Sequence, residues 1–316
     1  LLLLLSSQIS FAQTGWFWQN PLPQGNNLNA VKFININTGW AVGEKGTFIK
    51  TTDGGVSWTL MNTGHNSVYD YFSGVFFTSP STGYIAGGGG GLGSGKILKT
   101  TNGGLTWTQI NPAPNYPING IYFVNELLGF AAGSLGKIYK TTNAGIEWTI
   151  QTVTSSHLGP VFFVNTNVGY VSGNDSCIFR TTNGDVNWIK VKNAGRDYNG
   201  DMFFINDTTG FCCTWLDGLK KTTNGGMSWF VSENSRLWNA VYFINSSTGF
   251  ICGDGGMTMK TTDSGQHWFW VNNANLEQGL RDIVFTDTLN GIAVGSDGII
   301  RKSTNGGINW TTINNN

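Results

Sequence analysis

An eight-residue pattern that the chain repeats seven times constrains its fold more than any other feature. The first copy is Thr51-Thr52-Asp53-Gly54-Gly55-Val56-Ser57-Trp58. With one exception the copies keep the form Thr/Ser-Thr-Asp/Asn-x-Gly-x-x-Trp, and their tryptophans follow one another at spacings of 49, 41, 40, 41, 39 and 42 residues. A period of about 42 residues in a chain rich in glycine, threonine and aromatic residues is typical of a β-propeller, whose blades are small four-stranded sheets.

The residue types of this octapeptide suit a tight turn between two strands. Asn and Asp side chains accept hydrogen bonds from backbone amides two residues on. Because five of the seven copies carry Asn, no carboxylate is needed and no metal site is predicted. The glycine at the fifth position supplies the positive φ of a hairpin turn. Asp185 replaces it in the fourth copy, where we expect a distorted turn. The tryptophan begins the outgoing strand and covers the hairpin. The predicted structural residues are Asp53 and Trp58, Asn102 and Trp107, Asn143 and Trp148, Asn183 and Trp188, Asn224 and Trp229, Asp263 and Trp268, and Asn305 and Trp310.

Three strand segments stand before each tryptophan. In the first repeat they are residues 29–35, 40–43 and 47–51, and a fourth strand begins at the tryptophan. Both faces of these strands are apolar, as expected for sheets that pack against neighbours on two sides. The sequence therefore predicts an all-β fold: a seven-bladed β-propeller of four-stranded antiparallel blades, with the octapeptide as the turn between the third and fourth strands.

The chain divides into a short leader and one domain. The apolar run from Leu1 to Leu5 is too short to span a bilayer, and Ser10 and Ala12 fit the small residues before a signal-peptidase site. Residues 1–12 are therefore the expected remnant of a signal peptide that is cleaved before Gln13. Residues 13–316 form the predicted propeller, with blades at about 28–62, 67–111, 116–152, 157–192, 197–232, 236–272 and 278–314. Residues 16–23 resemble a fourth strand, and we expect them to close the ring on the last blade. These features predict a secreted, periplasmic or cell-surface protein with no integral membrane segment.

Composition argues against several classes of partner and chemistry. The 18 basic and 18 acidic residues cancel, which leaves no electrostatic footprint for nucleic acid or an anionic membrane. With three histidines and no Cys-x-x-Cys pair, no metal and no cofactor is predicted. Cys177, Cys212, Cys213 and Cys252 are expected to be small buried hydrophobes, with disulfides as the alternative that export would allow. The chain has no Gly-x-Ser-x-Gly or His-Glu-x-x-His motif, and no catalytic residue is predicted.

One basic residue precedes the Thr/Ser-Thr pair in every repeat. These residues are Lys50, Lys99, Lys140, Arg180, Lys221, Lys260 and Lys302. We expect them to form a solvated or salt-bridged face, with a basic ring as the alternative. On that interpretation replacing Lys140 should cost less than about 1 kcal/mol, as for an exposed charge. Replacing Trp148 by alanine should cost about 3–5 kcal/mol, as for a large buried aromatic.

The octapeptide resembles the Asp-box, also called the bacterial neuraminidase repeat. The longer unit, with Thr-Gly-aromatic and Val-Gly ahead of the octapeptide, resembles the propeller repeats of the photosystem II assembly and stability factor family, over roughly residues 16–314. In Asp-box families the motif is structural and lies away from the active site, so the resemblance implies a fold more than a chemistry. It leaves two alternatives open: a glycoside hydrolase of sialidase or glucanase type, and a role in photosystem II assembly if the host is photosynthetic. A Phe-Arg-Ile-Pro-like motif, which a sialidase would carry ahead of its first Asp-box, is missing here.

The predicted function is a secreted, monomeric, non-catalytic binding or scaffold module whose ligand is a protein or a glycan. Binding is expected on the face opposite the octapeptides, because variable loops on a rigid scaffold are where binding groups usually lie. The first candidate patch is His65, Tyr69, Asp70 and Tyr71, beside a hairpin at residues 87–95. The second patch joins Arg196, Arg236, Trp238 and Arg281 with the carboxylates of Asp197, Asp201, Glu233, Glu277 and Asp282. The alternative is that these are surface charges paired with one another.

Overall fold

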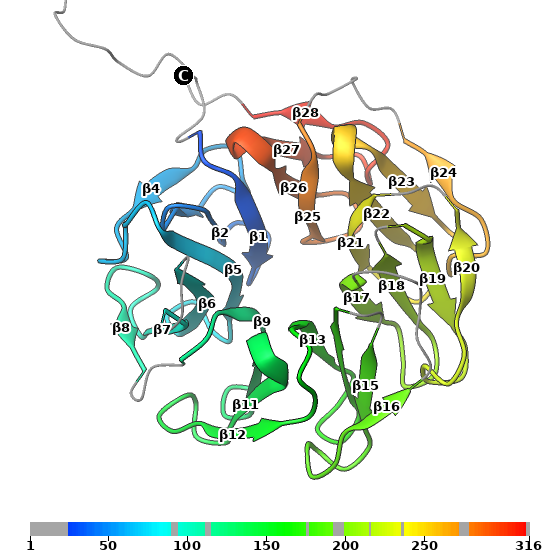
Figure 1. The fold of residues 1–316 in the computed structure, drawn as a ribbon. Helices are drawn as coiled ribbons and strands as arrows, with labels where there is room; N and C mark the ends of the chain where they lie inside the picture. The colour runs from blue at the N-terminus through cyan, green and yellow to red at the C-terminus, as the bar shows by residue number, and fades with distance from the viewer. Residues whose placement is uncertain are drawn as a thin grey trace, which may run out of the picture.

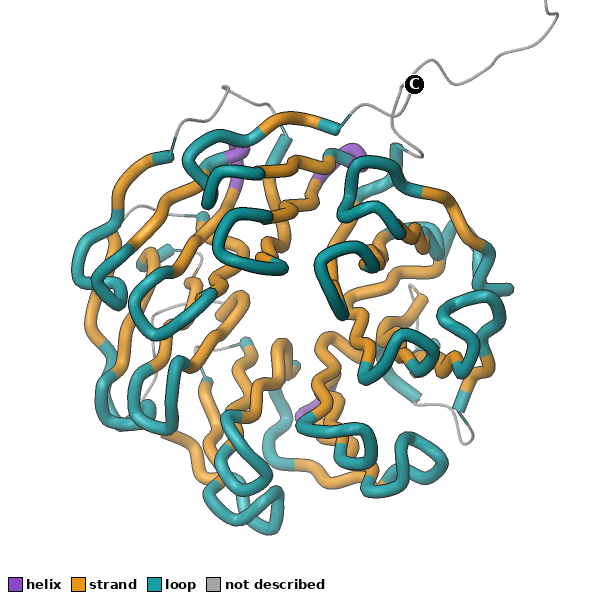
Figure 2. The backbone as a smooth tube through the Cα atoms, turned by 180° about the vertical axis from the view of Figure 1, so that it is seen from behind, coloured by secondary structure: helices purple, strands orange, loops and turns teal. Residues whose placement is uncertain are grey.

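The computed structural model describes residues 25–89, 94–110, 115–174, 177–191, 199–214, 216–234, 237–271 and 278–313. The expected leader and the expected closing strand at residues 16–23 lie outside the described residues. Within them, 28 strands form seven four-stranded antiparallel sheets, each with its strands in chain order from the centre of the ring to its rim. Figure 1 shows the seven sheets arranged as blades around one axis, and Figure 2 shows the opposite end of the ring. The predicted seven-bladed propeller is confirmed.

Each blade contributes one strand at each of four depths. The innermost strands are β1 (Leu28–Phe33), β5 (Asp70–Phe77), β9 (Ile118–Phe123), β13 (Leu158–Phe163), β17 (Asn199–Phe204), β21 (Trp238–Phe243) and β25 (Leu280–Phe285). The second strands are β2 (Gly39–Gly43), β6 (Gly83–Gly89), β10 (Gly129–Gly133), β14 (Gly169–Gly173), β18 (Gly210–Thr214), β22 (Gly249–Gly253) and β26 (Gly291–Gly295). The third strands are β3 (Phe48–Thr51), β7 (Lys96–Thr100), β11 (Lys137–Thr141), β15 (Ile178–Thr181), β19 (Gly218–Thr222), β23 (Thr258–Thr261) and β27 (Ile300–Ser303). The outermost strands are β4 (Thr59–Met61), β8 (Thr108–Gln109), β12 (Thr149–Thr152), β16 (Ile189–Val191), β20 (Phe230–Glu233), β24 (Phe269–Trp270) and β28 (Thr311–Thr312).

The antiparallel strand order gives the ring two different ends. The turn after each innermost strand lies beside the octapeptide turn, as the bond from Gly54 N to Asn37 O at 2.8 Å shows. We call this end the octapeptide face. The hairpins between second and third strands lie with the linkers that lead into the next blade, and here Gly46 N donates to Asp70 O at 3.0 Å. We call this end the linker face. Three of its hairpins carry short 3-10 turns, η1 (Ser134–Gly136), η2 (Asp254–Gly256) and η3 (Ser296–Gly298).

The octapeptide turns are stabilised by one side-chain oxygen. In the first copy Asp53 Oδ1 accepts the backbone N–H of Ser57 at 2.9 Å, and in the third copy Asn143 Oδ1 accepts that of Glu147 at 2.9 Å. The amide reached lies four residues on, where we had expected two. Because a carboxamide oxygen accepts this bond as well as a carboxylate does, Asn and Asp are interchangeable at the position.

The fourth octapeptide turn is not distorted, which corrects the expectation from Asp185. This aspartate has φ 81°, and the glycine at the same position of the first copy has φ 80°. Its N–H donates to Thr181 Oγ1 at 3.1 Å, the bond that the other copies make to their own threonine or serine. A non-glycine residue in this region is strained, and the Asp185 carboxylate offsets the strain by accepting hydrogen bonds from Trp188 Nε1 and Gln151 Nε2.

The blades are joined by a repeated aromatic contact. Every innermost strand ends in a phenylalanine, and Phe123 of β9 is an example. Its ring stacks on Tyr84 of the preceding blade, with centroids 4.0 Å apart, and meets the edge of Trp148 in its own blade at 6.1 Å. Gly129 faces the same ring, and a Cβ there would lie 2.4 Å from it. This glycine is therefore required by packing rather than by a turn.

The lysine of five repeats ties its blade to the next one. Lys140 Nζ donates to Gly184 O, in the octapeptide turn of the following blade, at 2.6 Å, and lies 5.8 Å from the centroid of Phe130. Four other lysines bind the matching carbonyl of the next turn: Lys50 at 3.0 Å, Lys99 at 2.6 Å, Lys221 at 2.6 Å and Lys260 at 2.8 Å. We expected these lysines to be solvated or paired with carboxylates. That expectation is wrong, because their main acceptor is a backbone carbonyl of the next blade. Lys140 Nζ also lies 4.0 Å from Asp185 Oδ2.

Replacing Lys140 by methionine is therefore expected to cost about 1–2 kcal/mol, more than an exposed charge would, because a charged hydrogen bond and a cation–π contact are lost together. Urea titration measures the change in the free energy of unfolding. Lys137→Met on the same strand is the control, since Lys137 Nζ binds Thr152 Oγ1 within its own blade. Equal losses for the two variants would show that the contact between blades adds nothing.

The ring closes between the last and first blades through polar contacts. Asp282 Oδ2 accepts the N–H of Val31 at 2.8 Å, and Arg281 Nη1 donates to Asn29 Oδ1 at 2.5 Å. Arg281 also lies 3.3 Å from Glu44 Oε1. At this junction Ile292 takes the place of the aromatic residue that stacks on the neighbouring phenylalanine at the six other junctions. This junction therefore combines polar contacts with an apolar cluster, in which Phe33 and Ile292 are buried, and has no ring stack.

Two further expectations can be compared with the fold. Cys177, Cys212, Cys213 and Cys252 are buried free thiols, as the interpretation as small hydrophobes predicts. Burial raises the pKa of the Cys213 and Cys252 thiols well above their ordinary value. In the part of the chain that the structure describes, no helix is long and apolar enough to cross a membrane.

Candidate functional site

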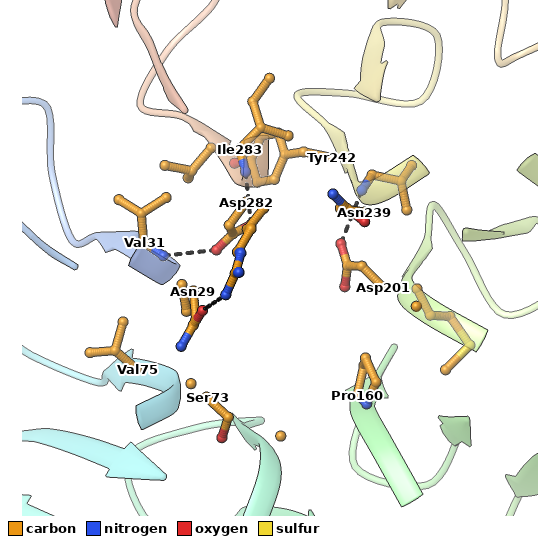
Figure 3. A pocket seen from close by; sticks show the side chains of 18 of the residues that line it. Asn29, Val31, Ser73, Val75, Pro160, Asp201, Asn239, Tyr242, Asp282 and Ile283 are labelled. Carbon is orange, nitrogen blue, oxygen red and sulfur yellow. Dashed lines mark hydrogen bonds between the residues drawn. The ribbon is translucent and has the colours of Figure 1, made fainter. Parts of the chain in front are cut away.

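The innermost strands of all seven blades surround a cavity of about 870 Å³ on the axis of the ring. Figure 3 shows its wall, with Asn29, Ser73 and Val75 on the left, Asp201, Asn239 and Pro160 on the right, and Asp282 near the top beside Val31. The same positions of each innermost strand face the cavity, so the side chains form layers. We refer to this cavity as the channel.

The layer nearest the linker face is made of hydrogen-bonding side chains that join neighbouring blades. Asn29 Nδ2 donates to Phe72 O at 2.8 Å, and Asn119 and Asn239 make the same bond to the following blade at 2.6 and 2.8 Å. Ser73 Oγ donates to Ile118 O at 2.6 Å. These side chains satisfy backbone carbonyls at the mouth of the channel.

The next layer is made mostly of small residues. Its positions, in blade order, hold Ala30, Gly74, Gly120, Pro160, Asp201, Ala240 and Asp282. Five of the seven side chains extend no further than a proline ring, which leaves room on the axis. The two carboxylates are the exceptions, and each accepts a backbone N–H of the next blade: Asp201 Oδ2 from Val241 at 3.0 Å and Asp282 Oδ2 from Val31 at 2.8 Å.

Below the small residues lies an aromatic layer. Its positions hold Lys32, Phe76, Tyr122, Phe162, Phe203, Tyr242 and Val284. Consecutive rings from Phe76 to Tyr242 have centroids 5.3, 5.2, 5.3 and 5.6 Å apart, so they form a continuous belt. Lys32 completes the belt on the other side, with Nζ 4.6 Å from the centroid of Phe76.

The channel perturbs the charges in its wall. Burial raises the pKa of Asp201 to about 6. Burial, and then the nearby Asp201 charge, raise the pKa of Asp282 to about 7. Burial lowers the pKa of Lys32, and the Asp282 charge opposes that shift. In the small layer, burial therefore destabilises the ionised form of both aspartates relative to the protonated form.

The first predicted patch is divided by the structure. Asp70 is buried and paired with Lys96, and its Oδ2 accepts the N–H of Ser67 at 3.0 Å, so its role is structural. His65 is half-buried and lines no cavity of the described chain, and burial followed by the Lys96 charge lowers its pKa. Tyr69, 74% exposed, and Tyr71 line a second cavity of about 470 Å³ on the linker face.

The second predicted patch is also revised. Arg196, Arg236, Asp197 and Glu277 lie outside the described residues. Trp238 is 0% exposed, and its Nε1 donates to Glu233 Oε2 at 2.6 Å, so it cannot serve as an exposed platform. The exposed ring at this place is Trp270, whose centroid lies 5.9 Å from that of Trp238. The two carboxylates that line the channel, described above, come from this patch.

Arg281 and Tyr71, one from each patch, meet at the mouth of the channel. Both line the channel wall, and both lie against Glu44: Arg281 through the ion pair and Tyr71 through a backbone bridge. Tyr71 and Asn119 line both cavities, so the channel mouth and the cavity beside Tyr69 form one surface. The two patches thus share a single site.

Sequence reasoning missed the amide layer and the aromatic belt. The signal that could have found them is the alignment of the seven innermost strands, in which the amide, small and aromatic residues occupy fixed columns. Alternation along a strand then assigns the small and aromatic columns to the same face.

Comparison with known proteins shows that the fold is similar to that of YCF48 propellers and of a GH74 enzyme. The model of the Photosynthesis system II assembly factor YCF48 family matches residues 10–159. No curated protein matches the chain. Among solved structures, "YCF48 bound to D1 peptide" is 20% identical with a TM-score of 0.72, over 90% of this chain and 95% of that one. YCF48 from Cyanidioschyzon merolae is 19% identical with a TM-score of 0.70, over 90% and 98%. The GH74 xyloglucanase from Xanthomonas campestris is 13% identical with a TM-score of 0.75, and the match spans 95% of this chain and 56% of the enzyme.

Proposed function

We propose, from the confirmed resemblance to photosystem II assembly factor repeats on a seven-bladed propeller, that this chain is a non-catalytic binding module for a protein segment. The single observation that carries the proposal is the joined surface on the linker face. Tyr71 and the Arg281 guanidinium line the channel mouth there, and exposed Tyr69 lines the cavity beside it. Aromatic and arginine side chains are the residues that most often anchor protein interfaces.

The likeness to other propellers supports the class of ligand. One solved propeller of this fold is described as bound to a D1 peptide, so the fold can present a peptide-binding surface. At 20% identity the likeness concerns the fold. A role in photosystem II assembly is included in the proposal for a photosynthetic host.

The chemistry of the channel favours binding over catalysis. Asp201 and Asp282 are the two carboxylates of the small layer, and each is hydrogen-bonded to the backbone of the next blade. A general acid or nucleophile needs a free oxygen directed at substrate. Here one oxygen of each carboxylate instead holds two blades together.

Selection of peptides from a displayed library against the purified chain tests the proposal, with the D1 peptide as one defined probe. The affinity of a selected peptide is measured by fluorescence anisotropy. Tyr69→Ala is expected to weaken it about tenfold or more, as for the loss of a hot-spot aromatic. The matched control is Phe269→Ala, which removes an aromatic ring of similar exposure, 60%, from the outer rim. Equal binding by both variants and the parent would show that the linker face is not the site.

A glycoside hydrolase of GH74 type is the second candidate, favoured by the likeness of fold to the Xanthomonas campestris xyloglucanase. A hydrolase assay on xyloglucan and a glycan array, both run on the same purified chain, separate the candidates. Turnover that is lost in Asp282→Asn, with the fold intact by circular dichroism, would replace the binding proposal with the enzymatic one. Glycan binding without turnover would keep the module non-catalytic and change its ligand.

Export and a monomeric state are part of the same proposal, on the evidence of the leader sequence and the closed ring. N-terminal sequencing of the protein recovered from a cell envelope or culture medium is expected to begin at Gln13. Light scattering on that material measures the oligomeric state. A start upstream of the Ser10-Phe11-Ala12 segment would contradict the expected cleavage site.

A further inference from the structure

The charged residues that line the channel do not balance. Two cations, Lys32 and Arg281, face three carboxylates, Asp201, Asp254 and Asp282. With all five ionised, the part of the wall that the structure describes carries one net negative charge. The channel therefore has a place for one more positive charge.

The position of the unmatched charge follows from the contacts. Arg281 is engaged by Asn29 and Glu44, and the Asp282 charge acts on Lys32. Asp254 Oδ1 accepts a hydrogen bond from Asn239 at 2.9 Å. Among the described residues no lysine or arginine is paired with Asp201. Its Oδ2 is held by Val241 N–H, and its charge lacks a cation.

Aromatic rings lie next to that charge. Asp201 and Phe203 are two residues apart on β17, so both side chains face the channel. Phe203 meets Tyr242 of the following blade at 5.6 Å between centroids. The neighbouring small-layer positions are glycine, proline and alanine, which leave the space above these rings open. A carboxylate beside aromatic faces is the combination that binds organic ammonium groups.

Lys32 shows that the channel already accommodates one such group. Its Nζ lies over the ring of Phe76 at 4.6 Å and interacts with the Asp282 charge. Asp201, Phe203 and Tyr242 offer the same two kinds of partner on the opposite side of the axis, where no lysine stands. Figure 3 shows Asp201 on the right of this wall and Tyr242 at the top, beside Ile283 and Asp282.

We propose that the channel binds one alkylammonium group between Asp201 and the rings of Phe203 and Tyr242. On a protein partner this group is a lysine side chain that enters from the linker face. The inference thus deepens the proposed function, on which the identity of the donor rests. The site itself is tested with small cations, so that its failure and the failure of the proposed function are distinguishable.

Binding should strengthen as the carboxylate ionises. Burial raises the pKa of Asp201 to about 6, so affinity for an ammonium group is expected to rise between about pH 5 and about pH 8. The other titratable and charged groups around Asp201 are Lys32, Tyr122, Cys212, Cys213, Tyr242, Cys252, Asp254, Arg281 and Asp282. Of these, Asp282 shares the pH window, since its pKa is raised to about 7.

The experiment compares choline with its uncharged isostere 3,3-dimethylbutan-1-ol, by saturation-transfer NMR and calorimetry on the folded chain at pH 8. Choline is expected to bind about tenfold more tightly than the isostere or better. A second comparison, of Nα-acetyl-lysine methylamide with its norleucine counterpart, measures whether the charge of a lysine side chain strengthens binding in the same way. If choline binds but the lysine derivative binds no more tightly than its norleucine counterpart, the site is restricted to small free ammonium ions. That result would overturn the assignment to a partner's lysine.

Two variants locate the site. Asp201→Asn keeps an oxygen for Val241 N–H and should weaken choline binding about tenfold and remove its pH dependence. Phe203→Leu keeps the apolar volume and should weaken binding about threefold or more. The control is Asp217→Asn, the same change on the same blade but outside the channel wall, which should bind like the parent. Equal affinity for choline and its isostere, or unchanged binding in Asp201→Asn, overturns the proposal. If Asp201→Asn does not fold, the comparison of charged and uncharged probes still decides it.

The chain can still bind a peptide through Tyr69 on the linker face if the channel does not bind ammonium groups. A parent chain that binds a selected peptide but neither choline nor lysine retains the proposed function and loses this inference. A chain that binds the small cations and selects no peptide retains the site and loses the proposed function.

Discussion

Replacing Phe123 by alanine is expected to lower the free energy of unfolding by about 3–5 kcal/mol, the range for deleting a large buried aromatic ring. The ring is 3% exposed and contacts three others: it stacks on Tyr84 and lies 5.9 Å from Phe76 of the preceding blade, and it meets the edge of Trp148 in its own. Its loss opens a void between two blades that the rigid sheets cannot fill. Urea titration followed by tryptophan fluorescence measures the change.

The control for this variant is Leu127→Ala in the same blade. Leu127 is 59% exposed on the octapeptide face, so its loss should cost less than about 0.5 kcal/mol. A loss of similar size in both variants would mean that the rings between blades do not carry the stability of the ring.

The stability of the chain is expected to fall as pH rises from about 4 to about 8, and Asp282→Asn should remove a large part of that fall. The ordinary pKa of this carboxyl is 3.8 and the folded one is raised to about 7. The folded state therefore holds more protons than the unfolded state between these values. A group with a raised folded pKa contributes stability that is present below the unfolded pKa and is lost as pH rises through the folded pKa.

The size of this effect is about 2 kcal/mol across the window, less than the full shift implies because water in the channel screens the charge. Asparagine keeps an oxygen for the N–H of Val31, so the contact between the blades survives. Thermal unfolding at a series of pH values gives the measurement. The control is Asp287→Asn, because hydrogen bonds from Asn290 and Leu289 lower the pKa of Asp287, and its contribution is lost only as pH falls below 3.8. A pH profile for Asp282→Asn that parallels the parent would contradict the assignment.

Much of the fold could be predicted from the sequence, because the information is periodic. The octapeptides mark the turns, and the strands before each tryptophan alternate in a fixed register. Asp185 was misjudged because glycine was taken as obligatory, whereas aspartate tolerates the left-handed region when its side chain is hydrogen-bonded.

The partners of the repeated lysines could not be predicted in the same way. The sequence shows that Lys140 recurs in one register, but its acceptor is a carbonyl 44 residues away in another blade. Only the packing of two blades creates that contact. Trp238 is a different case, since it stands in the same column as Leu28, Ile118 and Leu158, which are all buried. That column indicated a core residue rather than a binding platform.

The sequence indicated the linker face as the end of the ring that carries the candidate site. It did not indicate the channel at the centre of the ring. Tyr69 belongs to a variable linker, and such segments stand out in a repeat protein, whereas Arg281 lies on the innermost strand β25. The channel is built from positions about 40 residues apart that are each unremarkable alone, such as Gly74, Gly120 and Pro160. Their shared property, small size in one layer, becomes visible only when seven strands meet.

The polar junction between the last and first blades bears on the order in which this chain can assemble. Six junctions join blades that are neighbours along the chain and can form by short-range docking. The seventh joins residues 251 positions apart, as between Val31 and Asp282, so it pays the largest loop-closure entropy. Until the last blade exists, the side of the first blade that will meet it faces water. Asn29, Glu44 and the backbone N–H of Val31 remain hydrated there without penalty, and Ile292 arrives in place of an aromatic ring. The late closing step therefore buries Val31 and Phe33 of the first blade against Ile292 of the last together with these polar groups, and it forms no ring stack.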